Sequence, residues 1–153
     1  MDTLNTEEQQ RVDERYMQEA LKQAHEALRK DEVPIGAVVV CEGGIIGKGF
    51  NSIETLKDAT AHAEMLAFTS AASYLNGKYL RGCTLYVTLE PCTMCAGAAY
   101  WTQISRIVYG ASDEKRGFLK VAGGFLHPKA QLQGGILAEE CRQLILQFFA
   151  VKR

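Results

Sequence analysis

The sequence predicts an α/β fold of three layers (α/β/α), in which a central mixed five-stranded sheet lies between helices. β-branched runs alternate with amphipathic stretches through the middle of the chain, which is typical of this class. Of the 153 residues, 47% are hydrophobic and only three are proline, so the chain can form a core. Its length suits one domain, and we expect a single domain over residues 1–153.

The N-terminal elements are an amphipathic helix and a β-hairpin. Apolar side chains recur every three or four residues over 7–30, and Pro34 ends this helix. Two short β-branched runs at 35–40 and 45–50, separated by a glycine-containing turn, predict antiparallel strands. The polar stretch 51–58 is expected to be a loop.

Helices and strands then alternate to the end of the chain, and we expect these later strands to be mostly parallel. The pattern predicts a helix over 61–74, a strand over 84–89, a helix over 92–101 that Pro91 opens, a strand over 106–109, a glycine-containing loop over 110–135 with a short strand near Ala130, and a closing helix over 137–151.

Charge is unevenly distributed, although the net charge is only −1. Residues 1–32 hold nine Asp or Glu against five Lys or Arg, whereas residues 105–153 hold eight Lys or Arg against four acidic residues. The net charge of −1 excludes a strongly basic domain of the kind that binds nucleic acid through its overall charge. The C-terminal part is a candidate surface for a polyanion, and solvated helix faces are the equally simple alternative.

Neither a membrane span nor a secretory signal is expected. No run of about 18 apolar residues occurs, and the N-terminus is acidic and polar. Five cysteines are too few and odd in number for a disulfide framework, which indicates a reducing compartment, so we expect a cytoplasmic protein. Cys41, Cys83 and Cys141 are interpreted as small core residues.

The residues that carry chemistry are His62, Glu64, Cys92 and Cys95, found in H-A-E and P-C-T-M-C. Each motif opens a predicted helix, and cysteines three residues apart project from one side of a helical turn. One histidine and two thiolates suit zinc and leave a fourth position for water, which is typical of a catalytic site. Glu64 then serves as general acid and base. A redox pair is the alternative for C-x-x-C, but the order of the two motifs matches zinc deaminases.

Seven ordered blocks extend this match over nearly the whole chain. They are E-V-P-I-G-A-V-V-V (32–40), G-F-N (49–51), D-A-T-A-H-A-E (58–64), T-L-E-P-C-T-M-C-A-G-A (88–98), Y-G-A-S-D (109–113), L-H-P (126–128) and G-I-L-A-E-E-C (135–141). These blocks resemble the cytidine deaminase-like superfamily and, within it, the bacterial tRNA-specific adenosine deaminases.

The resemblance implies a cytidine deaminase-like fold with one zinc ion per chain, held by His62, Cys92 and Cys95, and Glu64 as the catalytic proton shuttle. The implied reaction is hydrolytic deamination of adenosine to inosine at the wobble position of tRNA, without an organic cofactor. The implied partners are a tRNA anticodon stem-loop and a second copy of the chain, which meets the helix after Pro91 near Trp101.

The resemblance also implies substrate contacts. Asn51 matches an asparagine that contacts the target nucleoside, the backbone of Ala63 lies where the base docks, and Asp113 matches an acidic residue near the RNA backbone. For Asn51 and Asp113 the structural alternatives are turn formation and capping. His127, in the basic C-terminal half, either contacts a phosphate or a stacked base or simply lines its loop.

Two aromatic residues near the chain end predict a further RNA contact. Phe148 and Phe149 precede Lys152 and Arg153, a combination suited to stacking on unpaired bases. The alternative is that one or both pack the last helix onto the sheet. We expect one of the two to be buried and the other to lie near the RNA, and Phe149 is the candidate site residue.

Two other functions stay open. The segment 100–103 lacks the His-Ser-Arg sequence common in this family after the second zinc cysteine, and its Tyr100–Trp101 pair resembles guanine deaminases. A deaminase of a free nucleobase or nucleoside such as guanine or cytidine is therefore the first alternative. The second is a non-catalytic zinc or RNA-binding module. Glu64 argues against it, because a structural site has no use for a non-ligating carboxylate beside the metal.

Overall fold

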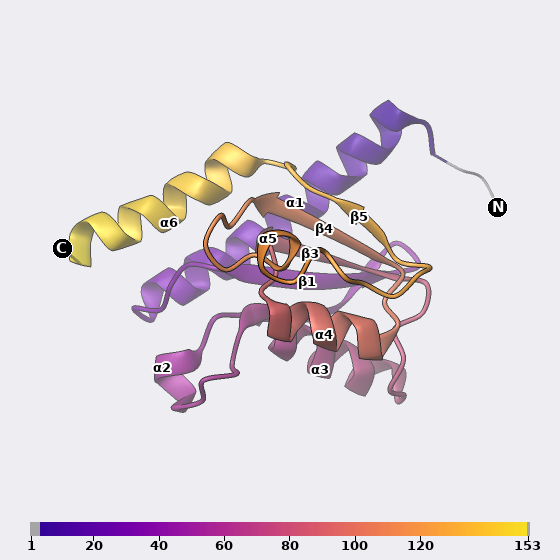
Figure 1. The fold of residues 1–153 in the computed structure, drawn as a ribbon, viewed down its shortest axis with the longest axis horizontal. Helices are drawn as coiled ribbons and strands as arrows, with labels where there is room; N and C mark the ends of the chain where they lie inside the picture. Colours follow the sequence, from indigo (N-terminus) through magenta and orange to yellow (C-terminus); the bar gives the residue numbers. More distant parts are fainter. Residues whose placement is uncertain (1–3, 153) are drawn as a thin grey trace.

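The computed structural model describes residues 4–152, and its centre is a five-stranded sheet with the order β2-β1-β3-β4-β5 (Figure 1). The strands are β1 (Gly36–Cys41), β2 (Gly44–Phe50), β3 (Cys83–Leu89), β4 (Arg106–Ala111) and β5 (Gln131–Gln133). β1 is antiparallel to both β2 and β3, whereas β3, β4 and β5 are parallel. The predicted mixed sheet of five strands is therefore confirmed.

Helices cover both faces of this sheet (Figure 1). The longer helices are α1 (Thr6–Arg29) and α6 (Ala138–Lys152) on one face and α3 (Ala63–Leu75) and α4 (Thr93–Thr102) on the other. Successive strand residues point to opposite faces, so Leu85 packs with α3 and α4 while its neighbour Tyr86 packs with α1 and α6. The three-layer prediction is confirmed.

The strand directions follow from the connections. A tight turn makes β2 antiparallel to β1. The helical connection through α3 then returns β3 in the same direction as β2, as crossover connections do, with β1 between the two strands. β3 is therefore antiparallel to β1, and the expected parallel pairing begins only at β4.

Two stretches that the sequence predicts to be loops contain single helical turns, α2 (Ile53–Leu56) and α5 (Phe118–Val121). α2 forms because the buried carboxylate of Glu32 accepts the N–H groups of Glu54 and Thr55, at 3.1 and 2.6 Å. The loop prediction for 51–58 is wrong at α2, since a contact with a residue 22 positions earlier leaves no periodicity in the segment itself.

β2 lies unusually close to the start of α3. A Cβ atom on Gly49 would sit 2.3 Å from the carbonyl oxygen of Ala63 and 2.8 Å from the nitrogen of Ala67, which excludes any larger residue unless the helix moves. This approach fixes the first turn of α3, and with it the neighbouring His62, relative to the sheet.

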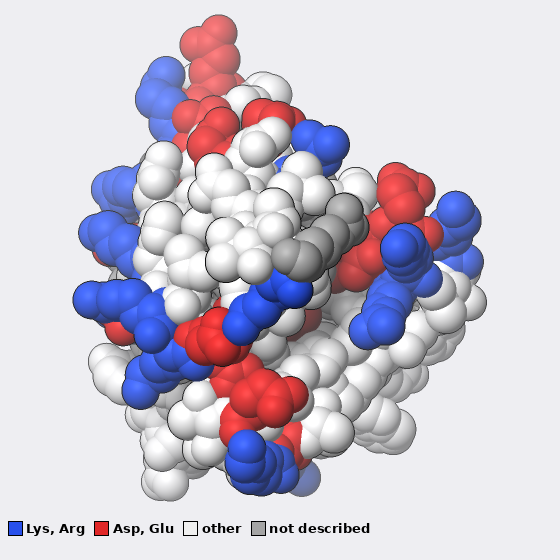
Figure 2. Space-filling view, turned by 90° about the vertical axis from the view of Figure 1, so that its left-hand side faces the viewer, with Lys and Arg blue, Asp and Glu red and all other residues white. Residues whose placement is uncertain are grey.

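Charged side chains of both signs are mixed on one side of the molecule. Figure 2 views the side toward which α2 and the end of α6 lie, where lysine and arginine side chains stand in separate groups with acidic side chains between them. The C-terminal excess of basic residues therefore does not form an uninterrupted basic face on this side. Among residues 4–152, every helix is too short or too polar to cross a membrane.

Candidate active site

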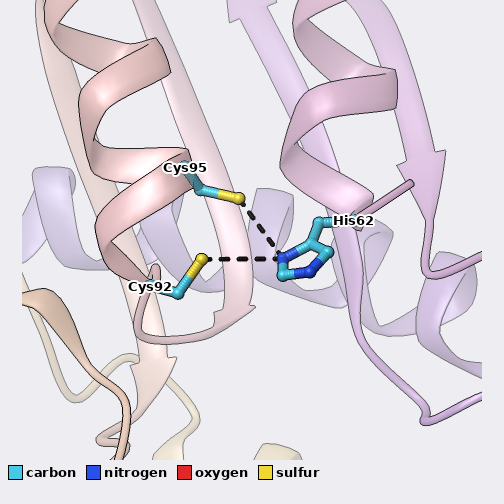
Figure 3. A group of neighbouring side chains, drawn as sticks. All are labelled: His62, Cys92 and Cys95. Atoms are coloured by element: carbon cyan, nitrogen blue, oxygen red, sulfur yellow. Dashed lines mark hydrogen bonds between the residues drawn. The ribbon is translucent and has the colours of Figure 1, made fainter. Parts of the chain in front are cut away.

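The metal-ligating side chains come from the starts of two neighbouring helices (Figure 3). His62 is the N-cap residue of α3, Cys92 is the N-cap residue of α4, and Cys95 lies in the first turn of α4. The sequence places His62 and Cys92 inside the helices, whereas both precede them with an extended backbone. α3 thus begins two residues later than predicted and α4 one residue later, and all three side chains are directed at the same point.

The distances within this cluster fit a zinc ion. The Nδ1 atom of His62 lies 3.6 Å from the sulfur of Cys92 and 3.6 Å from that of Cys95, and all three ligand atoms lie within 4.8 Å of one another. Zinc binds sulfur at about 2.3 Å and nitrogen at about 2.0 Å with tetrahedral angles, which puts such ligands about 3.6 Å apart. His62, Cys92 and Cys95 therefore form a group whose chemistry and spacing suit a zinc ion.

The electrostatics of the cluster prepare it for a cation. The pKa of Cys92 is lowered to about 3, first because the Cys95 thiol donates a hydrogen bond to it and then, against the effect of burial, because of His62. Conversely, the neighbouring Cys92 and burial raise the pKa of Cys95. Cys92 therefore favours its thiolate form, which is the form that binds a metal ion.

Glu64 lies in the first turn of α3 but outside the group of ligand atoms. Its side chain is buried, with 4% of its surface exposed. Burial raises the pKa of Glu64 to about 7, and a hydrogen bond with its own N–H and the nearby His62 offset this only in part. A carboxyl group of this kind, close to a metal cluster, can exchange protons near neutral pH.

The structure brings two predicted substrate residues to the same place. Asn51 is buried just after β2, and the N–H of the next residue, Ser52, donates to the carbonyl of Ala61 at 2.9 Å. Ala63, the first residue of α3, is buried as well. Both residues therefore border the cluster, and their contacts with a nucleoside stay predictions.

Asp113 has the capping role that the sequence left open as an alternative. Its carboxylate accepts the N–H groups of Lys115 and Arg116, at 3.1 and 3.0 Å, and thereby closes a turn. This geometry directs the main chain of the turn, and a direct contact of Asp113 with RNA stays a prediction.

His127 lies away from the metal ligands along α4. Its Nδ1 accepts the N–H of Lys129 at 3.2 Å, and its ring is 5.7 Å from that of Tyr100 in α4. These contacts match the interpretation that His127 lines its loop.

The prediction that one of the two C-terminal phenylalanines is buried is wrong. Phe148 is half-buried and Phe149 is 43% exposed. The C-terminal half of α6 extends past the sheet (Figure 1), and in α6 only Cys141 and Leu144 are buried. Lys152 pairs with Asp31 at 2.7 Å, and Arg153 lies outside the described residues.

Most basic side chains of the C-terminal part have an acidic neighbour. Lys120, Arg142 and Lys152 each lie within 4.0 Å of a carboxylate, and Arg106 is held by the buried Asp13. Over residues 105–152, the cations without such a carboxylate are Lys115, Arg116 and Lys129.

Sequence reasoning missed three buried carboxylates, Asp13, Glu32 and Glu90. Asp13 carried a usable signal, since it lies on the apolar stripe of α1, where an acidic residue indicates a buried partner. Glu32 and Glu90 stand in quoted blocks but bond to main-chain groups more than 20 residues away, which no local pattern reveals.

Comparisons with known proteins agree with this geometry. The family model for the cytidine and deoxycytidylate deaminase zinc-binding region matches residues 10–111. The tRNA-specific adenosine deaminase of Bacillus subtilis (strain 168) is 44% identical over 142 residues, which cover 90% of this chain and 88% of that protein.

Two solved structures have a similar fold. One, from work on A-to-I editing by tRNA:A34 deaminases at the wobble position of transfer RNA, has a TM-score of 0.79 and 38% identity, covering 85% of this chain and 98% of that one. The other, guanine deaminase from Bacillus subtilis, has a TM-score of 0.63 and 34% identity, covering 80% and 72%.

Proposed function

The chain belongs to the cytidine and deoxycytidylate deaminase family of zinc-binding proteins, and we propose that it deaminates adenosine to inosine at the wobble position of tRNA. The observation that carries the reaction type is the position of the His62 ring nitrogen, 3.6 Å from each of two cysteine sulfurs, with the buried Glu64 beside them. The high identity to a tRNA-specific adenosine deaminase over 90% of the chain supports the substrate.

His62, Cys92 and Cys95 would hold one zinc ion per chain. When bound there, zinc supplies a Lewis acid that makes water nucleophilic at neutral pH. Three protein ligands leave one position of a tetrahedral ion accessible, as hydrolytic sites require. The reaction consumes water and adenosine and yields inosine and ammonia, so it needs no organic cofactor.

Glu64 moves the protons of this reaction. Its carboxylate accepts a proton from the attacking water and gives it to the adenine ring nitrogen, and then carries the second proton of that water to the amino group, which leaves as ammonia. Asn51 and the main chain at Ala63 hold the nucleoside. The burial of Glu64 and its raised pKa, about 7, support this role, because both proton transfers must take place near neutral pH.

The macromolecular partner of the proposed enzyme is a tRNA anticodon stem-loop. His127 and Phe149 remain candidates for contacts with its bases or phosphates, and Asp113 for a place near its backbone. The reaction needs Cys92 and Cys95 as thiolates rather than as a disulfide, so we place it in the cytoplasm.

A second copy of the chain is the other proposed partner. Trp101 and Phe125 are 76% and 67% exposed, and they border a hollow of about 360 Å³ beside α4. An apolar patch of this kind marks a protein interface more often than a free surface, which favours a homodimer.

Deamination of free guanine is the second candidate function. The similarity to guanine deaminase from Bacillus subtilis and the Tyr100–Trp101 pair in α4 favour it. The two candidates differ in whether the base must be part of RNA.

Zinc-loaded protein should therefore be incubated separately with a wobble-adenosine stem-loop, guanine and cytidine. Chromatography of nuclease-digested RNA detects inosine, and an ammonia assay covers the small molecules. We expect inosine in the stem-loop and no ammonia from the free bases or nucleosides. Ammonia from guanine together with unchanged RNA would replace the proposed function with the second candidate.

A further inference from the structure

Glu90 is a buried carboxylate outside the metal cluster. It follows β3 and lies two residues before Cys92, with 5% of its surface exposed. One of its oxygens accepts the N–H of Asp113 and the other that of Leu119, both at 3.1 Å. Among residues 4–152, no lysine or arginine forms an ion pair with Glu90. Its hydrogen bonds therefore go to the main chain at the start of one segment, Asp113, and just past its end, Leu119.

That segment, residues 113–117, is named here the basic turn because it carries Lys115 and Arg116. The Asp113 carboxylate accepts both of their N–H groups, and the N–H of Gly117 donates to the Asp113 carbonyl at 3.0 Å. The main chain of the turn is thereby closed, while the side chains of Lys115 and Arg116 are exposed and have no acidic partner among the described residues.

The basic turn is attached directly to the chain segment that bears a metal ligand. Gly117 forms a β-bridge with Cys92, and the N–H of Phe118 donates to the carbonyl of Pro91 at 2.9 Å. A Cβ atom on Gly117 would lie 2.1 Å from a carboxylate oxygen of Glu90 and 2.6 Å from the carbonyl oxygen of Asp113. Only glycine allows this approach, so Glu90 and Gly117 together set the position of the two cations relative to Cys92.

We propose that Glu90 is a positioning residue for RNA binding, which holds Lys115 and Arg116 where they contact phosphates next to the target nucleotide. This inference rests on the proposed function. Phosphate contacts set the register of a nucleic acid, so two cations fixed relative to a metal ligand would set which nucleotide reaches the metal. Glu90 itself touches neither RNA nor the reacting atoms.

The test uses Glu90→Gln in the full-length, zinc-loaded protein with the wobble-adenosine stem-loop. The two hydrogen bonds that Glu90 accepts from the N–H groups of Asp113 and Leu119 are called the clamp. Glutamine keeps the shape of the side chain but turns an amide NH₂ toward one of these N–H groups, which breaks one end of the clamp. We expect the Kd and KM for the stem-loop to rise about tenfold, with kcat at saturating RNA nearly unchanged and zinc content still near one per chain. The slope of log Kd against log salt should become shallower by about 1.

Glu114→Gln is the matched control. Like Glu90→Gln, it removes one negative charge close to Lys115 and Arg116. The Glu114 side chain, however, is 82% exposed and takes no part in the clamp. If the loss of a negative charge were the whole effect, both variants would bind RNA more tightly than the wild type. We expect Glu114→Gln to bind RNA as tightly as the wild type or slightly more tightly, and Glu90→Gln to bind it more weakly. Gly117→Ala should reproduce the weaker binding of Glu90→Gln.

The double variant Lys115→Ala/Arg116→Ala isolates the mechanism. Adding Glu90→Gln to it should cause little further loss of binding, because the clamp then has no cations to position. A further tenfold loss would overturn the inference. The inference would also be overturned if Glu90→Gln kept the wild-type Kd and salt slope. A joint loss of zinc and kcat in Glu90→Gln would overturn it as well, because Glu90 would then support the metal cluster. Failure of the wild-type protein to deaminate the stem-loop would instead refute the proposed function.

Discussion

Among single residues, Glu64 is the one whose loss should separate metal binding from turnover. Because its carboxylate lies outside the ligand cluster, we expect Glu64→Gln to keep about one zinc per chain while activity falls by at least about 100-fold, the usual contribution of a positioned acid or base. Metal analysis and the stem-loop assay on the same preparation measure both quantities.

The control for this variant is Glu140→Gln, which neutralises an exposed carboxylate on α6 and should leave both quantities unchanged. Retained activity in Glu64→Gln would remove Glu64 from the mechanism. Loss of zinc together with activity would show that the carboxylate supports the metal rather than the proton transfers.

Glu32 should make stability depend on pH. Burial raises its pKa, but the hydrogen bonds from Thr55 and Glu54 and the nearby Lys57 outweigh burial and bring the pKa below the ordinary 4.5. A lowered folded-state pKa stabilises the fold above the unfolded-state pKa, and this contribution disappears as pH falls through the folded-state value.

We therefore expect Glu32→Gln to lower the free energy of unfolding by about 1 to 2 kcal/mol at neutral pH, and by progressively less as the pH falls below about 4.5. Urea unfolding at several pH values measures this difference. Glu54→Gln, an exposed neighbour in α2, should show no such trend. A difference from wild type that stays constant from neutral to acidic pH would contradict the assignment.

At the scale of secondary-structure elements, one buried ion pair adds to the apolar packing that joins α1 to the sheet. Both carboxylate oxygens of Asp13 accept from the Arg106 guanidinium, at 2.7 and 2.8 Å, and the Tyr86 hydroxyl donates to Asp13 at 2.9 Å. Because Asp13 is 2% exposed, removing only its partner leaves a buried charge uncompensated.

Arg106→Leu should consequently destabilise the protein by about 3 to 5 kcal/mol, and Asp13→Leu/Arg106→Leu should recover much of that loss. Thermal or urea unfolding tests this. The comparison is Arg142→Ala, which breaks an exposed ion pair with Glu139 and should cost less than about 1 kcal/mol. A double variant no more stable than Arg106→Leu would show that the pair adds net stability.

Elements whose formation depends on neighbouring residues could be predicted from the sequence, whereas elements that depend on distant residues could not. The long helices and the hairpin follow from side-chain periodicity, and the His62, Cys92 and Cys95 set follows from spacing, so all of these were predicted. α2 and the basic turn were not, because the carboxylates of Glu32 and Glu90 hold them from more than 20 residues away. The burial of one C-terminal phenylalanine was predicted wrongly, since periodicity does not show where the sheet beneath α6 ends.

At the scale of the whole molecule, the exposed apolar surface beside α4 predicts self-association. Tyr100 stacks on Phe125 with ring centroids 5.4 Å apart and meets Trp101 edge-on at 5.5 Å, so the three rings form one continuous surface. Trp101 is the most exposed of the aromatic residues in it. Large exposed aromatic side chains of this kind dominate the binding energy where they enter an interface.

We therefore expect the wild-type protein to sediment as a dimer at micromolar concentration and Trp101→Ser to raise the dimer dissociation constant about 30-fold, which corresponds to about 2 kcal/mol. Leu146→Ser is the control, because Leu146 is 45% exposed on α6, which covers the sheet face opposite to α4. A wild-type monomer would refute the dimer. An undisturbed dimer in Trp101→Ser would place the interface elsewhere, since a tryptophan at the centre of an interface cannot be truncated without loss of affinity.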